Sequence, residues 1–299
     1  MSDYHIPVLL SECIESLNIR PDGIYIDVTF GAGGHSKAIL EKLNANGHLY
    51  AFDMDDDAWD NAPDAANFTL IQSNYKFIEK FMRLYGVDQV DGILADLGIS
   101  SHQIDVPERG FSFRFDAPLD MRMNQSNPLD AQVIINEYNE ADLVNILSTY
   151  GEVRNAKTLA RAIVESRRNR GITTTGQLNQ ILDQNSMGPA NKYFAQVYQA
   201  LRIEVNGEIA GLAQFLTDGA KLLRPGGRFV VMSYHSLEDR LVKNIFKTGN
   251  TEGELDKDDF GAIQKTFEVV TKKPIVPDFK EQKRNPRSRS AKLRVAYKI

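Results

Sequence analysis

A glycine-rich turn between an apolar run and a helical pattern places the strongest constraint on how this chain can fold. Residues 24–30 alternate β-branched and aromatic side chains, which predicts a strand, and apolar residues recur at helical spacing from Ser36 onward. Gly31, Gly33 and Gly34 lie between the two, and because they lack a Cβ they allow positive φ and close approach of a ligand. The stretch therefore predicts the first strand–turn–helix unit of a nucleotide-binding sheet.

The spacing of the glycines and the position of the next acid indicate which nucleotide the turn would hold. The dinucleotide fingerprint needs a third glycine where this chain has Ser36, so a pyrophosphate is disfavoured. The second expected strand, residues 48–53, ends in Asp53, where a ribose diol needs hydrogen-bond acceptors. S-adenosylmethionine has this ribose and no phosphate, which also suits the acid Asp27 at the end of the first strand. The sequence therefore favours S-adenosylmethionine as the cofactor.

Two further strands are expected to bring functional groups to the same place. Residues 68–72 form a short third strand, followed by Tyr75, whose ring could cover an adenine or cap the core. Residues 90–96 are mostly apolar, as expected for a fourth strand covered on both faces. Ligands of such sheets lie outside the carboxyl ends of the strands, where the strand order reverses. The side chains expected to converge there are Asp27, Asp53, Tyr75, Asp96 and Gln103.

The alternation of strands and helices stops after the fourth strand. Residues 106–204 contain no strand pattern but several helical patterns, two of which are expected to end at glycine caps, Gly151 and Gly171. We therefore expect residues 1–105 and 205–299 to form a sheet domain, and residues 106–204 to form an inserted helical domain that recognises the substrate.

The sheet pattern resumes after the helical stretch. Residues 228–233 are the expected fifth strand, and His235 follows it at the start of another helix. Residues 266–271 and 291–299 are expected to pair as antiparallel strands at one edge of the sheet, with residues 273–289 as a loop between them. This ending is typical of a methyltransferase sheet rather than of a dehydrogenase.

Charge is unevenly distributed along the chain. The net charge of −5 argues against diffuse attachment to nucleic acid, but a local basic patch can still bind RNA phosphates. One candidate patch includes Arg161 and Arg168 of the helical domain, for which a solvated helix face is the alternative. A second candidate is the stretch of residues 283–299, which contains no acid. It is either a solvated tail or an RNA-binding patch. Its basic residues are Lys283, Arg284, Arg287, Arg289, Lys292, Arg294 and Lys298.

The composition argues against several other classes of protein. No apolar run approaches the roughly 20 residues of a membrane helix, and the first residues lack the pattern of a signal peptide, so a cytoplasmic location is expected. The single cysteine, Cys13, excludes an intramolecular disulfide and lies in an apolar pattern typical of a buried thiol. The five histidines have no metal-ligand spacing, and no metal is predicted.

Long motifs are spread over nearly the whole chain. They are His5-Ile-Pro-Val-Leu-Leu, Asp27-Val-Thr-Phe-Gly-Ala-Gly-Gly-His-Ser, Asp96-Leu-Gly-Ile-Ser-Ser, Gly110-Phe-Ser-Phe, Pro118-Leu-Asp-Met-Arg-Met, Gln199-Ala-Leu-Arg-Ile-Glu-Val-Asn, His235-Ser-Leu-Glu-Asp-Arg and Asn285-Pro-Arg-Ser-Arg-Ser-Ala-Lys-Leu-Arg. In this order the sequence resembles the bacterial small-subunit (16S) ribosomal RNA cytosine-N4 methyltransferases of the MraW/RsmH family.

The resemblance implies a class I S-adenosylmethionine-dependent methyltransferase fold: an α/β, Rossmann-like doubly wound sheet with an antiparallel edge strand, and an inserted helical domain. It implies methylation of the N4 amine of one cytidine in the decoding region (P site) of 16S rRNA, with S-adenosyl-L-methionine as cofactor and the small ribosomal subunit as partner. A homodimer stays open. Carried over by motif, the cofactor contacts are Gly33, Gly34, His35, Asp53, Tyr75, Asp96 and Gln103.

The resemblance does not identify the proton acceptor. The lone pair of the cytosine amine is delocalised into the ring, so the amine must be oriented in line and must lose a proton. The base must also leave its stack, and Phe111, Phe113 or Tyr234 is expected to receive it. His235 is our candidate acceptor because an imidazole titrates near neutral pH, and the alternative is a histidine that holds the turn by hydrogen bonds.

Two other functions stay open at this stage. A methyltransferase of the same fold could act on another substrate, such as a small molecule, but the basic stretch and the inserted domain would then have no purpose. A non-enzymatic rRNA-binding assembly factor could use the cofactor only to order its loops. Turnover distinguishes this factor from an enzyme, whereas cofactor binding does not.

Overall fold

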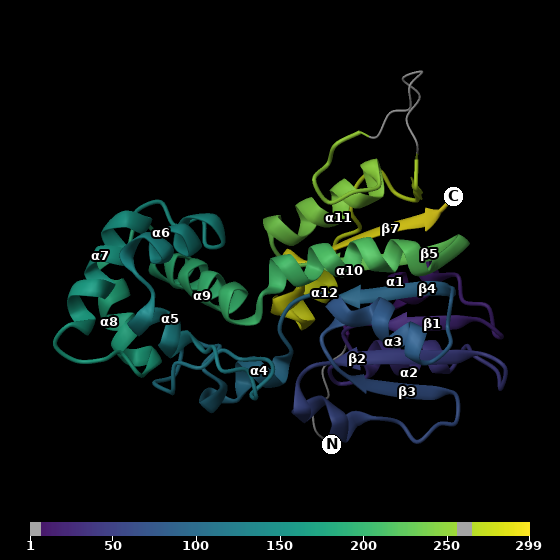
Figure 1. Ribbon diagram of the computed structural model, residues 1–299, viewed down its shortest axis with the longest axis horizontal. Coiled ribbons are helices and arrows are strands. Elements are labelled where there is room, and N and C mark those ends of the chain that lie inside the picture. Colours follow the sequence, from purple (N-terminus) through teal and green to yellow (C-terminus); the bar gives the residue numbers. More distant parts are fainter. Residues whose placement is uncertain (1–6, 256–264) are drawn as a thin grey trace. The chain divides into compact units, whose positions relative to one another are not determined.

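A computed structural model describes residues 7–255 and 265–299 of the chain. The chain divides into two compact units (Figure 1). The sheet unit consists of Met1–Gly98 and Ile209–Ile299, and the helical unit consists of Ile99–Glu208. The boundaries expected from the sequence, after residue 105 and before residue 205, lie a few residues inside the helical unit. The role of this unit in substrate recognition stays a prediction.

The sheet unit contains a seven-stranded sheet with the order β3-β2-β1-β4-β5-β7-β6 (Figure 1). Neighbouring strands from β3 to β5 are parallel, whereas β7 pairs antiparallel with both β5 and β6. This is the doubly wound sheet with antiparallel strands at one edge that the sequence predicts. The strands are β1 (Ile24–Asp27), β2 (His48–Asp53), β3 (Phe68–Gln72), β4 (Val90–Asp96), β5 (Leu223–Ser233), β6 (Phe267–Val269) and β7 (Lys292–Lys298).

Helices cover both faces of this sheet because alternate strand residues point to opposite sides. Tyr25 and Leu94 share one buried cluster with side chains of α1 (Leu10–Leu17) and α2 (Gly34–Leu40). Ile26 and Ile93 share the opposite cluster with side chains of α3, α10 and α11. The bounds of those three helices are α3 (Ile78–Leu84), α10 (Glu208–Leu222) and α11 (Ser236–Thr248). The strand order reverses between β1 and β4, which is where a sheet of this type binds its ligand.

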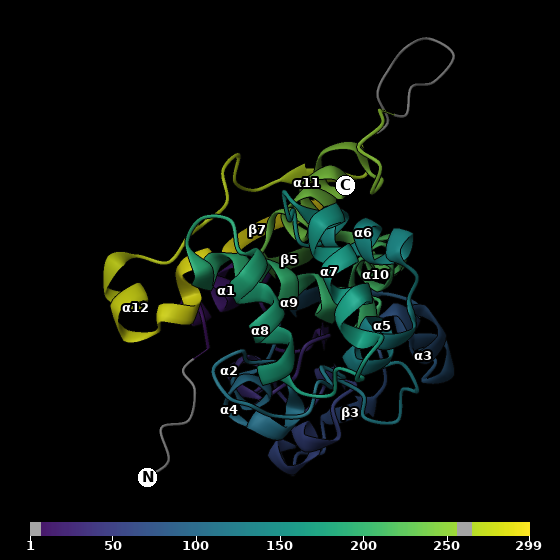
Figure 2. The ribbon, with the colours of Figure 1, turned by 90° about the vertical axis from the view of Figure 1, so that its left-hand side faces the viewer.

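The helical unit has a hydrophobic core of its own. Its longest helix, α9, contacts α5, α6 and α8 (Figure 2). Between residues 99 and 208 the structure contains no strand, and only an isolated bridge joins Pro118 to Thr174. The helices are α4 (Ser101–Asp105), α5 (Ala131–Glu137), α6 (Glu140–Thr149), α7 (Ala156–Arg167), α8 (Thr175–Asn185) and α9 (Ala190–Asn206).

The two glycine caps expected in the helical unit are wrong. Neither Gly151 nor Gly171 has a positive φ, and the left-handed residue after α6 is Glu152 with φ 51°. After α7, the backbone of Arg168 stays in the right-handed helical region.

The side chain of Arg167 connects α7 to α5, because it donates hydrogen bonds to the carbonyls of Ile135 and Tyr138 at the end of α5.

The segment expected as a loop, residues 273–289, contains a short helix, α12 (Phe279–Arg284), and a 3-10 turn (Pro286–Ser290). Local caps explain both, because the side chain of Asp278 accepts the N–H of Glu281 and that of Asn285 accepts the N–H of Arg287. No helix in the described parts of the chain combines the length and apolarity that a membrane span needs.

Part of the expected basic tail holds the sheet unit together. Arg294 of β7 donates two hydrogen bonds to Asp239 of α11, at 2.7 and 3.2 Å, and Lys292 lies 3.5 Å from the same carboxylate. Lys298 donates to the carbonyls of Ala220 and Lys221, at the end of α10. Burial acts to raise the pKa of Asp239, but Arg294 and Lys292 outweigh it and lower the pKa below its ordinary value.

We expect Arg294→Ala to lower the free energy of unfolding by about 2 kcal/mol, because Asp239 loses a two-point partner in a largely buried place. Because the pKa of Asp239 is lowered, this contribution is present at neutral pH and disappears as the pH falls through that pKa. Urea unfolding followed by the fluorescence of Trp59, the one tryptophan of the chain, reports on the sheet unit.

The matched control for this measurement is Arg289→Ala, since Arg289 is exposed and precedes β7. We expect it to change the free energy of unfolding by less than about 0.5 kcal/mol. Equal effects of the two substitutions would show that the contact between Arg294 and Asp239 contributes nothing to stability.

Candidate functional site

The glycine turn follows β1 and is held from within by a buried carboxylate. Asp27, at the end of β1, is 1% exposed and accepts hydrogen bonds from the hydroxyl of Ser36 (2.7 Å) and the N–H of Thr29 (3.1 Å). Thr29 in turn accepts the N–H of Asp96 on its hydroxyl oxygen, at 2.7 Å, which ties β1 to β4. Burial raises the pKa of Asp27. The structure therefore gives Asp27 a role in shaping the turn.

Asp53 holds the turn from the neighbouring strand. Its carboxylate accepts the N–H of Gly31 at 2.8 Å and the N–H of Asp55 at 2.9 Å. Burial raises the pKa of Asp53 from 3.8 to about 6, although both hydrogen bonds act to lower it. Each carboxylate oxygen can accept more than one hydrogen bond, so these contacts leave acceptor capacity for a ribose hydroxyl.

Different constraints require glycine at the three positions of the turn. Gly31 and Gly33 have positive φ, 52° and 75°. A Cβ on Gly31 would meet nothing within 4 Å, so a ligand can approach this backbone, whereas a Cβ on Gly33 would lie 3.0 Å from the ring of Phe30. At Gly34 a Cβ would overlap the ring of Pro7. The close approach at Gly34 is therefore to the chain itself.

The side chain of His35 is buried in the first turn of α2. Its Nε2 lies 3.3 Å from the carbonyl oxygen of Val8, and its Nδ1 lies 3.8 Å from a carboxylate oxygen of Asp96. The ring thus connects the segment before α1 with the end of β4. A cofactor contact of His35 would therefore use its backbone, and this contact stays a prediction.

Asp96 and Tyr234 join the carboxyl ends of β4 and β5. The Tyr234 hydroxyl donates to Asp96 at 2.8 Å, and its ring lies over Gly98, where φ is 119° and a Cβ would come within 3.2 Å of the ring. Burial and then the charge of Asp96 raise the pKa of Tyr234 well above its ordinary value, so the hydroxyl keeps its proton and stays a donor. The sequence places Tyr234 at this edge but does not predict its bond to Asp96.

The two remaining expected cofactor residues lie in different units. Tyr75 follows β3 in the sheet unit, and its half-buried ring packs against Phe215 of α10 with 5.3 Å between ring centres. Gln103 belongs to the helical unit, where it exchanges hydrogen bonds with Ser100 in a capping box at the start of α4. The contacts of Tyr75 and Gln103 with a cofactor stay predictions.

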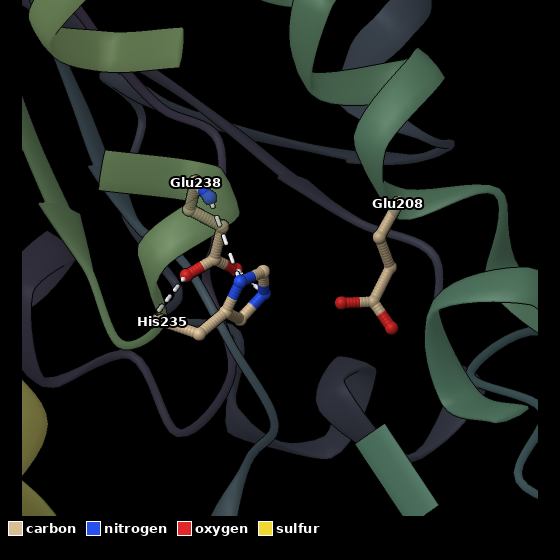
Figure 3. A group of neighbouring side chains, drawn as sticks. All are labelled: Glu208, His235 and Glu238. Atoms are coloured by element: carbon tan, nitrogen blue, oxygen red, sulfur yellow. Dashed lines mark hydrogen bonds and ion pairs between the residues drawn. The ribbon is translucent and has the colours of Figure 1, made fainter. Parts of the chain in front are cut away.

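His235 caps α11 together with Glu238 (Figure 3). Its Nδ1 accepts the N–H of Glu238 at 3.5 Å, and the carboxylate of Glu238 accepts the N–H groups of Tyr234 (2.8 Å) and His235 (3.3 Å). The Nε2 of His235 lies 3.1 Å from the other carboxylate oxygen, close enough for an ion pair when the ring is protonated. Glu208, also labelled in Figure 3, pairs with Arg202 inside the helical unit.

Two groups that shape the site were not singled out by the sequence. The hydroxyls of Thr29 and Ser36 connect Asp27 to its surroundings, and both lie in the motif that begins at Asp27. The signal available in the sequence was the presence of two hydroxyl residues within nine positions of a strand-terminal acid, because such an acid needs donors when it is buried.

Comparison with known proteins places the chain in a family. Residues 2–299 match the sequence model of the MraW methylase family. The ribosomal RNA small subunit methyltransferase H of Flavobacterium johnsoniae is 55% identical over 298 residues, which cover 99% of this chain and 98% of that protein. The protein of the same name from Cytophaga hutchinsonii is 56% identical over 296 residues, which cover 98% and 99%.

Among solved structures, an rRNA methylase from Streptococcus thermophilus aligns over 97% of this chain and 93% of its own, with 13% identity and a TM-score of 0.38. The fold of this chain is given by its own strand order. The full-length match and the two relatives lead to one conclusion: the chain belongs to the MraW methylase family.

Proposed function

We propose that this protein transfers the methyl group of S-adenosyl-L-methionine to the N4 amine of a cytidine in 16S rRNA, in the decoding region of the small ribosomal subunit. The observation that carries the proposal is the full-length match to the MraW methylase family. The site agrees with it, because a glycine turn and an acid meet where the strand order of the sheet reverses.

The residues at the strand ends fit S-adenosyl-L-methionine. Asp53 ends β2, keeps acceptor capacity for the ribose hydroxyls, and holds Gly31 with its open backbone beside it. When bound, this cofactor supplies a methyl group on a positively charged sulfur, which an amine can attack. The contribution of the chain is to hold the ribose and to orient the amine in line with that methyl group.

At the reacting end of the site, Asp96 is the hydrogen-bond acceptor that the geometry favours. Its carboxylate lies at the end of β4, beside the order reversal, and the Tyr234 hydroxyl fixes one of its oxygens. A hydrogen bond from a neutral donor stabilises the ionised carboxylate. Asp96 can therefore accept a hydrogen bond either from the amine of the target base or from the cofactor.

His235 is less well prepared to accept a proton. Its Nδ1 already accepts the N–H of Glu238, and its Nε2 faces the Glu238 carboxylate at 3.1 Å. To act as a base, His235 would have to release the N–H of Glu238 from its Nδ1, which would remove the N-cap of α11. Its role as catalytic residue stays a prediction, and capping accounts for the contacts that the structure gives it.

The substrate base must be unstacked before its amine can reach this edge of the sheet. Of the rings expected to receive it, Phe111 is buried in the core of the helical unit, and Phe113 packs edge-on against Phe194 and Tyr198. Phe113 and Tyr234 are both half-buried, and Tyr234 is the one of the three rings that belongs to the sheet unit. It is therefore the candidate that we retain for stacking.

The finer points of substrate and location rest on the same proposal. The proposed substrate is 16S rRNA within the small ribosomal subunit. Arg161 is 70% exposed and lies 4.0 Å from Glu140, and Arg168 is also exposed, so both side chains are accessible to phosphates. A cytoplasmic location and a homodimer stay predictions.

The decisive test is methyl transfer from labelled S-adenosyl-L-methionine to small subunits from a strain that lacks this gene. We expect N4-methylated cytidine, identified by mass spectrometry of the nucleosides. Asp53→Ala should abolish the transfer, and the matched control Asp60→Ala, which alters an exposed acid of the following 3-10 helix, should not. No transfer by a wild-type protein that binds the cofactor would contradict the proposal and favour an assembly factor.

Cofactor binding should weaken in mild acid because the ribose hydroxyls need an ionised Asp53. The pKa of this group is about 6 in the ligand-free protein, so affinity should fall about 10-fold between pH 7 and pH 5 in calorimetric titrations. Asp53→Asn should bind weakly with a flat profile over this range. An unchanged affinity of the wild-type protein at pH 5 would remove Asp53 from the binding site.

The same shift has the opposite sign for the stability of the ligand-free protein. Because burial favours the neutral form of Asp53, its contribution to stability is present below pH 3.8 and is lost as the pH rises through about 6.

Capping and catalysis by His235 can be separated with two substitutions. We expect His235→Ala to lower the free energy of unfolding by about 1 kcal/mol and His235→Asn to restore most of it, since asparagine is a good N-cap. Both should keep kcat within a few-fold of wild type when the protein is fully folded. A loss of 100-fold or more in kcat for both variants, with unchanged cofactor affinity, would instead identify His235 as the proton acceptor.

A further inference from the structure

The region around α12 exposes an aromatic ring among cations. Phe279 is 80% exposed, more than any other aromatic side chain in the described parts of the chain, and Val276 nearby is 56% exposed. A single exposed apolar residue is ordinary on a protein surface and would mean little alone. Here the ring is flanked by the basic residues Lys280, Lys283, Arg284, Arg287 and Arg289.

Four basic side chains of this segment have no ion-pair partner in the described parts of the chain. Residues 276–290 contain five basic residues and two acids, Asp278 and Glu281. The carboxylate of Asp278 accepts the N–H of Glu281 at 2.7 Å, and the carboxylate of Glu281 accepts the N–H of Leu9 at 2.8 Å. Among the described residues, Lys280, Lys283, Arg284 and Arg289 form no ion pair, and all four are exposed. A local basic surface on a chain of net charge −5 suits an anionic partner.

Hydrogen bonds hold the segment that contains α12 (Figure 2) to the rest of the sheet unit and to itself. The bond from Leu9 to Glu281 attaches α12 to α1, and Gln282 donates to the carbonyl of Pro277 at 2.8 Å. In the following turn Ser288 is buried and donates to the carbonyl of Asn285 at 2.7 Å. Because folding already orders this backbone, a partner would not have to meet that cost on binding.

This segment differs from the basic residues that follow it. Arg294 and Lys298 of β7 are occupied by Asp239 and by the carbonyls at the end of α10. The basic stretch expected from the sequence therefore has two parts, one that stabilises the sheet unit and one that faces solvent. The attraction of cations to the end of a helix can explain Lys283 and Arg284, but it explains neither Phe279 nor Arg289.

We propose that residues 276–290, the α12 platform, bind a single-stranded segment of the substrate RNA, with Phe279 stacked on an unpaired base and the flanking cations on its phosphates. This inference rests on the proposed function, because it assigns a surface to the same RNA substrate. Exposed aromatic rings beside basic side chains are how proteins hold unpaired nucleotides without reading a long sequence.

The test uses the full chain, small subunits that lack the methyl group, and two variants. Phe279→Ala should weaken binding to subunits about 5- to 150-fold, the range expected for one stacked base. The triple variant Lys283→Ala, Arg284→Ala and Arg289→Ala should reduce the slope of log Kd against log salt by about 2, since each lost contact with single-stranded phosphate contributes about 0.7. Both variants should keep the wild-type affinity for S-adenosyl-L-methionine.

Matched controls alter exposed groups elsewhere on the sheet unit. Leu84→Ala removes a side chain of α3 that is 74% exposed, and the triple variant Lys42→Ala, Lys80→Ala and Lys243→Ala removes the same charge from other exposed positions. Neither control should change the affinity for subunits more than about 2-fold, because uniform charge effects are screened over about 8 Å at physiological salt.

The outcomes separate this inference from the proposed function. Platform variants that methylate subunits with wild-type KM, in a preparation where the wild-type protein is active, would overturn the platform and leave the methyltransferase standing. Absence of methyl transfer by the wild-type protein would overturn the proposed function itself, and with it the platform. Wild-type binding to vesicles of equal parts phosphatidylglycerol and phosphatidylcholine that is lost in the platform variants, with subunit affinity unchanged, would assign the surface to a membrane and overturn the RNA platform.

Discussion

Hydrogen bonds that involve three strand-terminal aspartates fix the shape of the site: Asp27 and Asp53 accept on their carboxylates, and Asp96 donates its backbone N–H. Buried carboxylates are costly unless donors surround them, and the glycine turn supplies those donors. Asp27 binds the hydroxyl of Ser36 and the N–H of Thr29, Asp53 binds the N–H of Gly31, and the N–H of Asp96 is bound by Thr29. The turn is therefore held by β1, β2 and β4 at once. Its positive φ angles persist because these contacts leave it little freedom.

This arrangement divides the expected site residues by their task. Asp27 and the ring of His35 are occupied by the protein itself, and Gly34 is packed against Pro7. Asp53 keeps acceptor capacity, and the backbone at Gly31 is open. The family of the chain and the geometry of its sheet support the same cofactor and the same edge of the sheet. What each side chain does there follows from its remaining hydrogen-bonding capacity, which only the structure reveals.

The sequence predicted best where burial alone decides the structure. The bounds of β2, β3 and β4 agree with expectation. The clearest case is β4, a central strand that is covered on both faces and therefore gives an apolar run. It predicted least well where partners lie far apart in the chain. Arg294 binds Asp239, which lies 55 residues earlier in the chain. The sequence alone therefore suggested that Arg294 belonged to a solvated basic tail. The predicted helix ends were wrong for a related reason: Glu152, rather than a glycine, has the left-handed backbone conformation after α6. The roles of Gln103 and His235 stay predictions.

The place of β7 in the sheet has a consequence for how the chain is made. β6 precedes β7 in the sequence, yet it pairs only with β7, which lies between β6 and β5. The helical unit, by contrast, comes from one continuous stretch with its own core. During synthesis the helical unit can therefore be complete while β4 still has an open edge, and the sheet closes only after Lys292–Lys298 have left the ribosome. A nascent chain arrested before that point would present unpaired strand edges, the surfaces that chaperones protect from aggregation.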